Sequence, residues 1–81
     1  MKLKEFEIGK FYGKSEKDRK WAIKISGYGY GVFQGVCAKE SKYENYLTDA
    51  DIFLEPKDCT EISEAEFLRT KESVLEKINR K

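Results

Sequence analysis

The sequence contains no histidine, only two cysteines and a single proline. Without histidine, the chain can form none of the Ser–His or Cys–His pairs that activate nucleophiles in many hydrolases. Cys37 and Cys59 alone supply too few ligands for a four-coordinate zinc site. We therefore expect a protein that is not an enzyme and that holds no metal or other cofactor.

Long hydrophobic runs are also missing. No apolar run approaches the roughly 18 residues that a membrane-spanning helix needs. Residues 1–7 lack the continuous apolar core of a secretory signal peptide. We expect a cytoplasmic protein without membrane association, and buried free thiols at Cys37 and Cys59 because that compartment keeps cysteines reduced.

The residues that are present suit one small globular domain. The 81 residues are 40% hydrophobic and 38% charged, and they include five Phe, five Tyr and one Trp. This aromatic content distinguishes the chain from a disordered one. A chain of this length forms a single domain with a small core. We predict one domain over residues 1–81, with a β-rich part over 3–62 and a C-terminal helix within 63–79.

Residues 21–36 combine the only tryptophan with four of the six glycines and two of the five tyrosines. Trp21, Ile23 and Ile25 alternate with smaller or polar residues, which predicts a half-buried strand. The glycines that follow predict a hairpin turn and a second strand.

The register of this hairpin can be predicted from its apolar residues. Pairing Ile25 with Val32 and Trp21 with Val36 places these side chains on one face. That register predicts a two-residue or four-residue loop that includes Tyr28.

The region before the hairpin predicts one strand and one basic loop. Phe6 and Ile8 share one phase of an alternating pattern, and Gly9 suggests a bend or bulge in the strand. Residues 14–20 have no apolar side chain, which predicts an exposed connection. Its four cations are Lys14, Lys17, Arg19 and Lys20.

Two short strands are predicted in the second half, at residues 52–54 and 59–62. Pro56 closes the first of them because it cannot donate a hydrogen bond to a strand ladder. A helix over about residues 64–79 follows. Ser63 and Glu66 have the spacing of a capping box at its start.

Four or five short strands followed by one helix predict an α+β fold. Its simplest form is a small, strongly bent, SH3-like antiparallel barrel with the helix packed across it. An open antiparallel sheet with the helix on one face is the alternative. In both arrangements the predicted core consists of Trp21, Ile23, Ile25, Val32, Val36, Ile52, Leu54, Phe67, Val74, Leu75 and Ile78.

For function, the leading hypothesis is a non-catalytic protein-interaction module. Tyrosine is enriched at interfaces because it combines a large apolar area with a hydroxyl group. The predicted partner contacts are Tyr12, Tyr28, Tyr30, Tyr43 and Tyr46. Such a module could act as a stoichiometric inhibitor or regulator of another protein, with an acidic surface that mimics phosphates, formed by Asp49, Asp51, Glu55, Asp58 and Glu61.

The alternative hypothesis is a small barrel that binds single-stranded RNA or DNA. Tyr28 and Tyr30 would stack on bases, and the cations of residues 14–20 would contact phosphates. The sequence does not identify the partner in either case.

Overall fold

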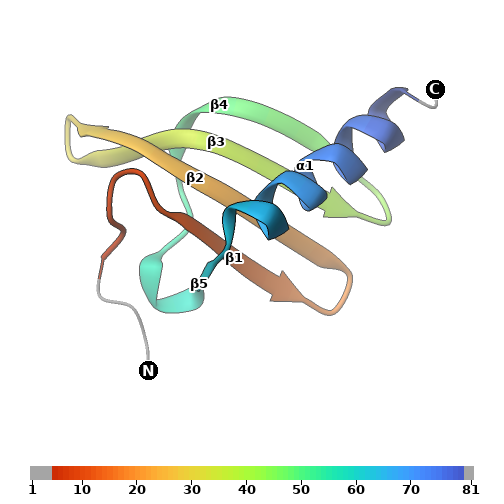
Figure 1. Cartoon of the computed structure of the whole chain (residues 1–81), viewed down its shortest axis with the longest axis horizontal. Coiled ribbons are helices and arrows are strands. Elements are labelled where there is room, and N and C mark those ends of the chain that lie inside the picture. Colours follow the sequence, from red (N-terminus) through yellow and green to blue (C-terminus); the bar gives the residue numbers. More distant parts are fainter. Residues whose placement is uncertain (1–4, 80–81) are drawn as a thin grey trace.

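The computed structural model of this protein describes residues 5–79, so residues 3 and 4 of the predicted β-rich part lie outside the described residues. Within this range the fold is α+β, with five antiparallel strands in one sheet and one α-helix after them (Figure 1). The strands are β1 (Phe11–Glu16), β2 (Arg19–Gly29), β3 (Val32–Ser41), β4 (Tyr46–Ile52) and β5 (Thr60–Ile62). A short 3-10 turn, η1, spans Pro56–Asp58, and helix α1 spans Glu64–Asn79.

The sheet is open. Its strand order is β4-β3-β2-β1-β5, so β4 and β5 form its two edges. Because the sheet is not closed, the predicted SH3-like barrel is not confirmed, and the alternative, an open antiparallel sheet with the helix on one face, describes the fold. Closure would require β4 and β5 to pair with each other, but among the described residues β4 pairs with β3 alone and β5 with β1 alone.

One face of the sheet carries the main hydrophobic core. Trp21, Ile23 and Ile25 of β2 lie on this face, and Ile23 and Ile25 are fully buried. Two segments outside the sheet help to cover it. Phe6 comes from the segment before β1, and Cys59 from the connection between β4 and β5.

The opposite face packs against α1, which crosses in front of the sheet in Figure 1. Ala22 of β2 and Ala38 of β3 pair with each other and are fully buried on this face. Small side chains there let the helix approach closely. Phe67 of α1 meets Phe11 of β1 with 5.2 Å between ring centroids.

Both faces are thus covered, which explains why apolar residues in β1 and β2 do not simply alternate with polar ones. Tyr12 faces the main core while its neighbour Phe11 faces the helix. Trp21, Ala22 and Ile23 are likewise consecutive and all buried. A strand covered on both faces has apolar residues in successive positions.

The predicted register of the central hairpin was wrong. Ile25 lies opposite Gly35, and Gly29 opposite Val32, with a bulge between Ile25 and Gly27. Gly35 makes the observed register possible, because a Cβ at this position would lie 1.8 Å from the carbonyl oxygen of Lys24. The backbones approach so closely only because residue 35 has no side chain.

The new register changes which residues reach the core. Phe33 packs against the main core, whereas Val32 and Val36, which were predicted to be core residues, are only half-buried. Leu75 is exposed, also against the prediction. Among the other predicted core residues, Leu54 and Ile78 are half-buried, and those that are buried are Trp21, Ile23, Ile25, Ile52, Phe67 and Val74.

The N-terminal predictions also need correction. Gly9 belongs to a turn before β1, with φ of 88°, and its N–H donates to the Ile25 carbonyl at 2.7 Å. Most of the predicted loop at residues 14–20 is strand, because β1 and β2 remain paired as far as Glu16 and Arg19. Only Lys17 and Asp18 form the turn.

In the second half, β4 begins at Tyr46 and ends at Ile52, so the predicted strand at residues 52–54 was wrong except for Ile52. The strand near residues 59–62 and the helix are confirmed. At the helix start, the N–H of Glu66 donates to the Ser63 hydroxyl at 3.1 Å, as the capping pattern predicts. No helix within residues 5–79 has the length and hydropathy of a membrane span.

Tyr30 and Gly31 form the turn between β2 and β3, with φ of 56° and 81°. Tyrosine in this left-handed conformation is strained, whereas asparagine tolerates it. Replacing Tyr30 by asparagine should therefore raise the free energy of unfolding, measured in urea, by about 1 kcal/mol.

Tyr28→Asn is the control. It should destabilise, because the Tyr28 ring packs on Phe33 with centroids 4.8 Å apart. A Tyr30→Asn variant no more stable than the parent would contradict this account.

Candidate functional site

The five tyrosines do not form one surface. Tyr12 is buried in the main core, where its hydroxyl accepts a hydrogen bond from the Glu7 N–H at 2.8 Å, so it was wrong to expect an exposed contact there. Tyr28 and Tyr30 are exposed at the tip of the β2–β3 hairpin. Tyr43 is exposed in the β3–β4 connection, at the other end of the sheet (Figure 1).

Tyr46, the fifth tyrosine, lines an apolar pocket of about 350 Å³ beside β4. We call this cavity the β4 pocket. Trp21 and Cys37 reach it from the main core face of the sheet, and Leu54 reaches it from the β4–β5 connection. The complete lining is Trp21, Cys37, Tyr46, Thr48, Ala50, Asp51, Ile52, Phe53 and Leu54.

An exposed aromatic ring lies at the β4 pocket, and two lysines contact aromatic rings that line it. Phe53 follows directly after β4, and 84% of its surface is exposed. The ammonium group of Lys39 lies 5.7 Å from the centroid of the Trp21 ring and 5.5 Å from that of Tyr46. Lys14 lies 5.0 Å from the Trp21 centroid. These cation–π contacts hold the aromatic rings in place beside the cavity.

The thiols near this pocket are poor nucleophiles. Burial raises the pKa of the Cys59 thiol to about 11, and burial likewise raises the pKa of the Cys37 thiol. Both groups are therefore protonated at neutral pH, and the thiolate is the reactive form. Cys37 contributes to the pocket wall as a small apolar side chain.

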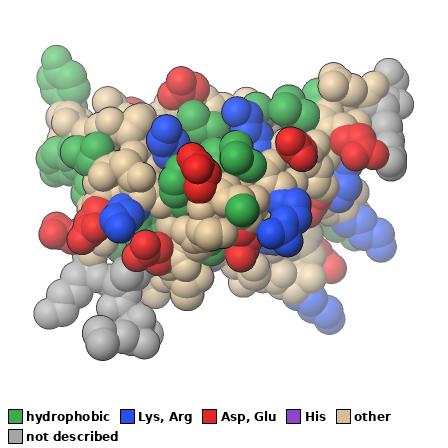
Figure 2. Space-filling model, in the orientation of Figure 1, with side chains coloured by type: hydrophobic (Ala, Val, Ile, Leu, Met, Phe, Trp, Pro, Cys, Tyr) green, Lys and Arg blue, Asp and Glu red, His purple; other side chains and the backbone are tan. Residues whose placement is uncertain are grey.

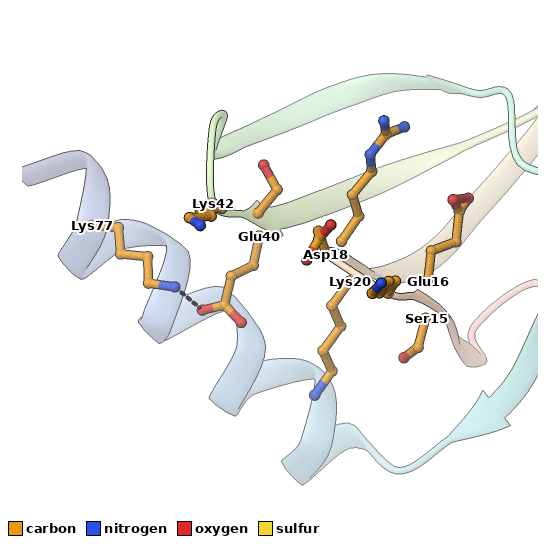
Figure 3. A pocket seen from close by; sticks show the side chains of 10 residues that line it. Ser15, Glu16, Asp18, Lys20, Glu40, Lys42 and Lys77 are labelled. Atoms are coloured by element: carbon orange, nitrogen blue, oxygen red, sulfur yellow. Dashed lines mark ion pairs between the residues drawn. The ribbon is translucent and has the colours of Figure 1, made fainter.

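A second cavity, of about 380 Å³, is polar and lies at the β1–β2 turn (Figure 3). Its carboxylate Glu40 pairs with Lys77 at 3.0 Å and accepts a hydrogen bond from the Ser73 hydroxyl. The hydrogen bond from Ser73, followed by Lys77, lowers the pKa of Glu40. Figure 3 shows Glu40 and Lys77 pointing toward each other between β3 and α1. These contacts of Glu40 with Ser73 and Lys77 link β3 to the helix at this cavity.

The predicted nucleic-acid residues are divided between distant places. Lys17, Arg19 and Lys20 line the polar cavity at one end of β2, while Tyr28 and Tyr30 lie at its other end. Eleven strand residues separate these ends by roughly 30 Å. Lys14 does not line this cavity, because it stacks over Trp21 and pairs with Glu16 at 3.4 Å.

The predicted acidic residues are exposed, but they lie on three different elements. Asp49 and Asp51 belong to β4, Glu55 and Asp58 to the β4–β5 connection, and Glu61 to β5. Lysines partly neutralise two of these carboxylates, since Lys57 lies 3.1 Å from Glu55 and Lys10 lies 3.8 Å from Glu61. On the face that carries α1, acidic and basic side chains are interspersed (Figure 2).

Sequence reasoning missed Phe53 and Lys39 as site residues, and it treated Trp21 as a core residue alone. Phe53 lies in an apolar run that resembles a strand, so its exposure had no signal in the sequence. The position of Lys39 beside Trp21 follows from their pairing across β2 and β3, which the predicted register did not contain.

The fold and the β4 pocket define a small α+β protein with an open sheet and an aromatic cavity beside one sheet edge. No protein-family model, curated protein or solved structure matches the chain.

Proposed function

We propose that this protein is a non-catalytic protein-interaction module that binds its partner through the β4 pocket. The observation that carries the proposal is the combination of an apolar cavity lined by Trp21 and Tyr46 with the exposed Phe53 at its rim. Aromatic side chains beside a cavity are typical of the residues that dominate binding energy at protein interfaces.

The other surfaces give weaker support for a function. In the polar cavity, Glu40 is already bonded to Ser73 and Lys77, which gives it a structural role. Single-stranded nucleic-acid binding is the less favoured alternative, because the exposed tyrosines of the hairpin and the cations of the β1–β2 turn lie at opposite ends of β2. A non-catalytic role also agrees with two buried, protonated thiols.

A module of this kind would act stoichiometrically, as an inhibitor or regulator that occupies a surface of its partner. We place it in the cytoplasm as part of the same proposal, since both cysteines are free thiols.

Site-specific photo-crosslinking in the native cell tests the proposal. A benzoylphenylalanine at position 53 should form an adduct with a partner polypeptide, because Phe53 is exposed at the pocket rim. The matched control places the same group at Leu68, an exposed apolar residue of α1. Adding Thr48→Trp should abolish the Phe53 adduct, since Thr48 is exposed and lines the pocket.

The proposal fails if position 53 forms no polypeptide adduct, if the same adduct forms from position 68, or if Thr48→Trp leaves it unchanged. Circular dichroism of each variant checks that the fold is intact.

A further inference from the structure

We propose that the partner contributes an extended segment that pairs with the free edge of β4 as a sixth strand, with apolar side chains in the β4 pocket alternating with Lys or Arg side chains. This inference rests on the proposed function and specifies the chemistry of the partner.

The first argument is the free edge of β4. Among the described residues, the seven residues of β4 pair with β3 alone, and none of them takes part in a backbone hydrogen bond outside that ladder. The edge of such a strand presents N–H and C=O groups in the spacing that an added strand requires. The β4 pocket opens beside this same strand.

The second argument is the alternation of side chains along β4. Tyr46, Thr48 and Ala50 line the pocket, as Ile52 does. The residues between them, Leu47, Asp49 and Asp51, point to the other face of the sheet, although Asp51 also borders the pocket near the end of β4. Two of these, Asp49 and Asp51, are exposed, and no ion pair joins either to another described residue. One face of the edge is therefore largely apolar, and the other face carries two carboxylates beside Leu47.

An added strand would follow the same pleat, because side chains alternate between faces in every strand. Its residues on the pocket side would lie beside Tyr46, Thr48 and Ala50, where apolar side chains would lose their contact with water. Its residues on the other side would lie opposite Asp49 and Asp51, where a cation is favoured. The complementary segment alternates apolar and basic residues.

The same charges disfavour a second copy of this chain as the occupant. If two β4 strands pair antiparallel with their apolar faces on the same side, Asp49 lies opposite Asp49 or Asp51 in the central registers. Like charges directly opposite each other destabilise a strand pair. The partner is therefore a different polypeptide with basic residues.

A pair of synthetic peptides tests this inference. The first is a fluorescein-labelled heptapeptide of alternating lysine and apolar residues, Lys-Val-Lys-Phe-Lys-Val-Lys. The second has the same composition with its apolar residues together, Val-Phe-Val-Lys-Lys-Lys-Lys. The alternating peptide should bind about tenfold more tightly in fluorescence anisotropy. It should also change the emission of Trp21, the only tryptophan.

Charge reversal tests the electrostatic part. Asp49→Lys combined with Asp51→Lys should weaken binding of the alternating peptide by roughly tenfold. The matched control, Glu7→Lys combined with Glu72→Lys, makes the same change in net charge at exposed positions outside β4 and should have a much smaller effect. Circular dichroism and thermal unfolding of both double variants establish that they are folded.

The inference is overturned if neither peptide binds at millimolar concentration, if the two peptides bind equally, or if the two double variants respond alike. It is also overturned if light scattering shows that the protein forms a dimer that Asp49→Lys dissociates. If crosslinking from position 53 still occurs in any of these cases, only the added-strand inference fails and the proposed protein-interaction function is retained. If crosslinking is lost as well, both the inference and the proposed function are wrong.

Discussion

Replacing Gly35 by alanine is expected to remove a large part of the free energy of unfolding. The added Cβ would lie 1.8 Å from the carbonyl oxygen of Lys24 and 2.9 Å from its carbonyl carbon. Both atoms belong to the backbone of β2, so the overlap can be relieved only by separating β2 and β3 next to the bulge between Ile25 and Gly27.

The cost should be about 3 kcal/mol or more, at the upper end of the usual cost of overpacking. A domain of this size is stable by roughly 4 to 12 kcal/mol, so this is a large part of the total. Urea unfolding followed by circular dichroism measures the difference. Gly27→Ala is the matched control, because its Cβ would meet only the Gln34 side chain, at 4.0 Å. Equal losses for the two variants would contradict the steric explanation.

Phe67→Ala is expected to cost about 3 to 5 kcal/mol, which is typical of removing a buried aromatic ring. Phe67 is 3% exposed and connects the first turns of α1 to Phe11 of β1. Its loss removes an aromatic contact between helix and sheet, so the helix should unfold more readily than the strands. Amide hydrogen exchange should show faster exchange in α1 than in β2 and β3.

The neighbouring residue supplies the control for this change. Leu68 is 45% exposed on the same helix, and Leu68→Ala should cost less than about 1 kcal/mol because little apolar surface is removed from the interior. If both variants lose the same stability, α1 does not pack on the sheet through Phe67.

Local patterns were sufficient to predict several elements. The helix at Glu64–Asn79 follows from its apolar periodicity and from the Ser63 cap, both of which lie within a short stretch of sequence. The existence of the β2–β3 hairpin follows from alternation and from its glycines. The lack of histidine, and with it of any Ser–His or Cys–His pair within these 81 residues, is also a property of the sequence alone.

The candidate site was harder to predict. Tyr46 was selected for its residue type, and it does line the β4 pocket, but Tyr12 was selected for the same reason and is buried. Residue type describes what a side chain can do, whereas exposure depends on the elements that cover it. Phe53 illustrates the opposite error. Its apolar run predicted a buried strand residue, but β4 ends just before Phe53 and the side chain is exposed.

The sequence by itself determined that the chain contains this capped helix and a glycine-rich hairpin, because capping, periodicity and turn preference act between residues close together in the chain. Only the tertiary structure decided the register of the hairpin, the open edge at β4 and the pocket beside it. The register depends on the close approach of Gly35 to Lys24, and the pocket depends on Trp21 of β2, Tyr46 of β4 and Phe53 after β4 lining the same cavity. Such contacts join residues that are distant in sequence, so no local pattern encodes them.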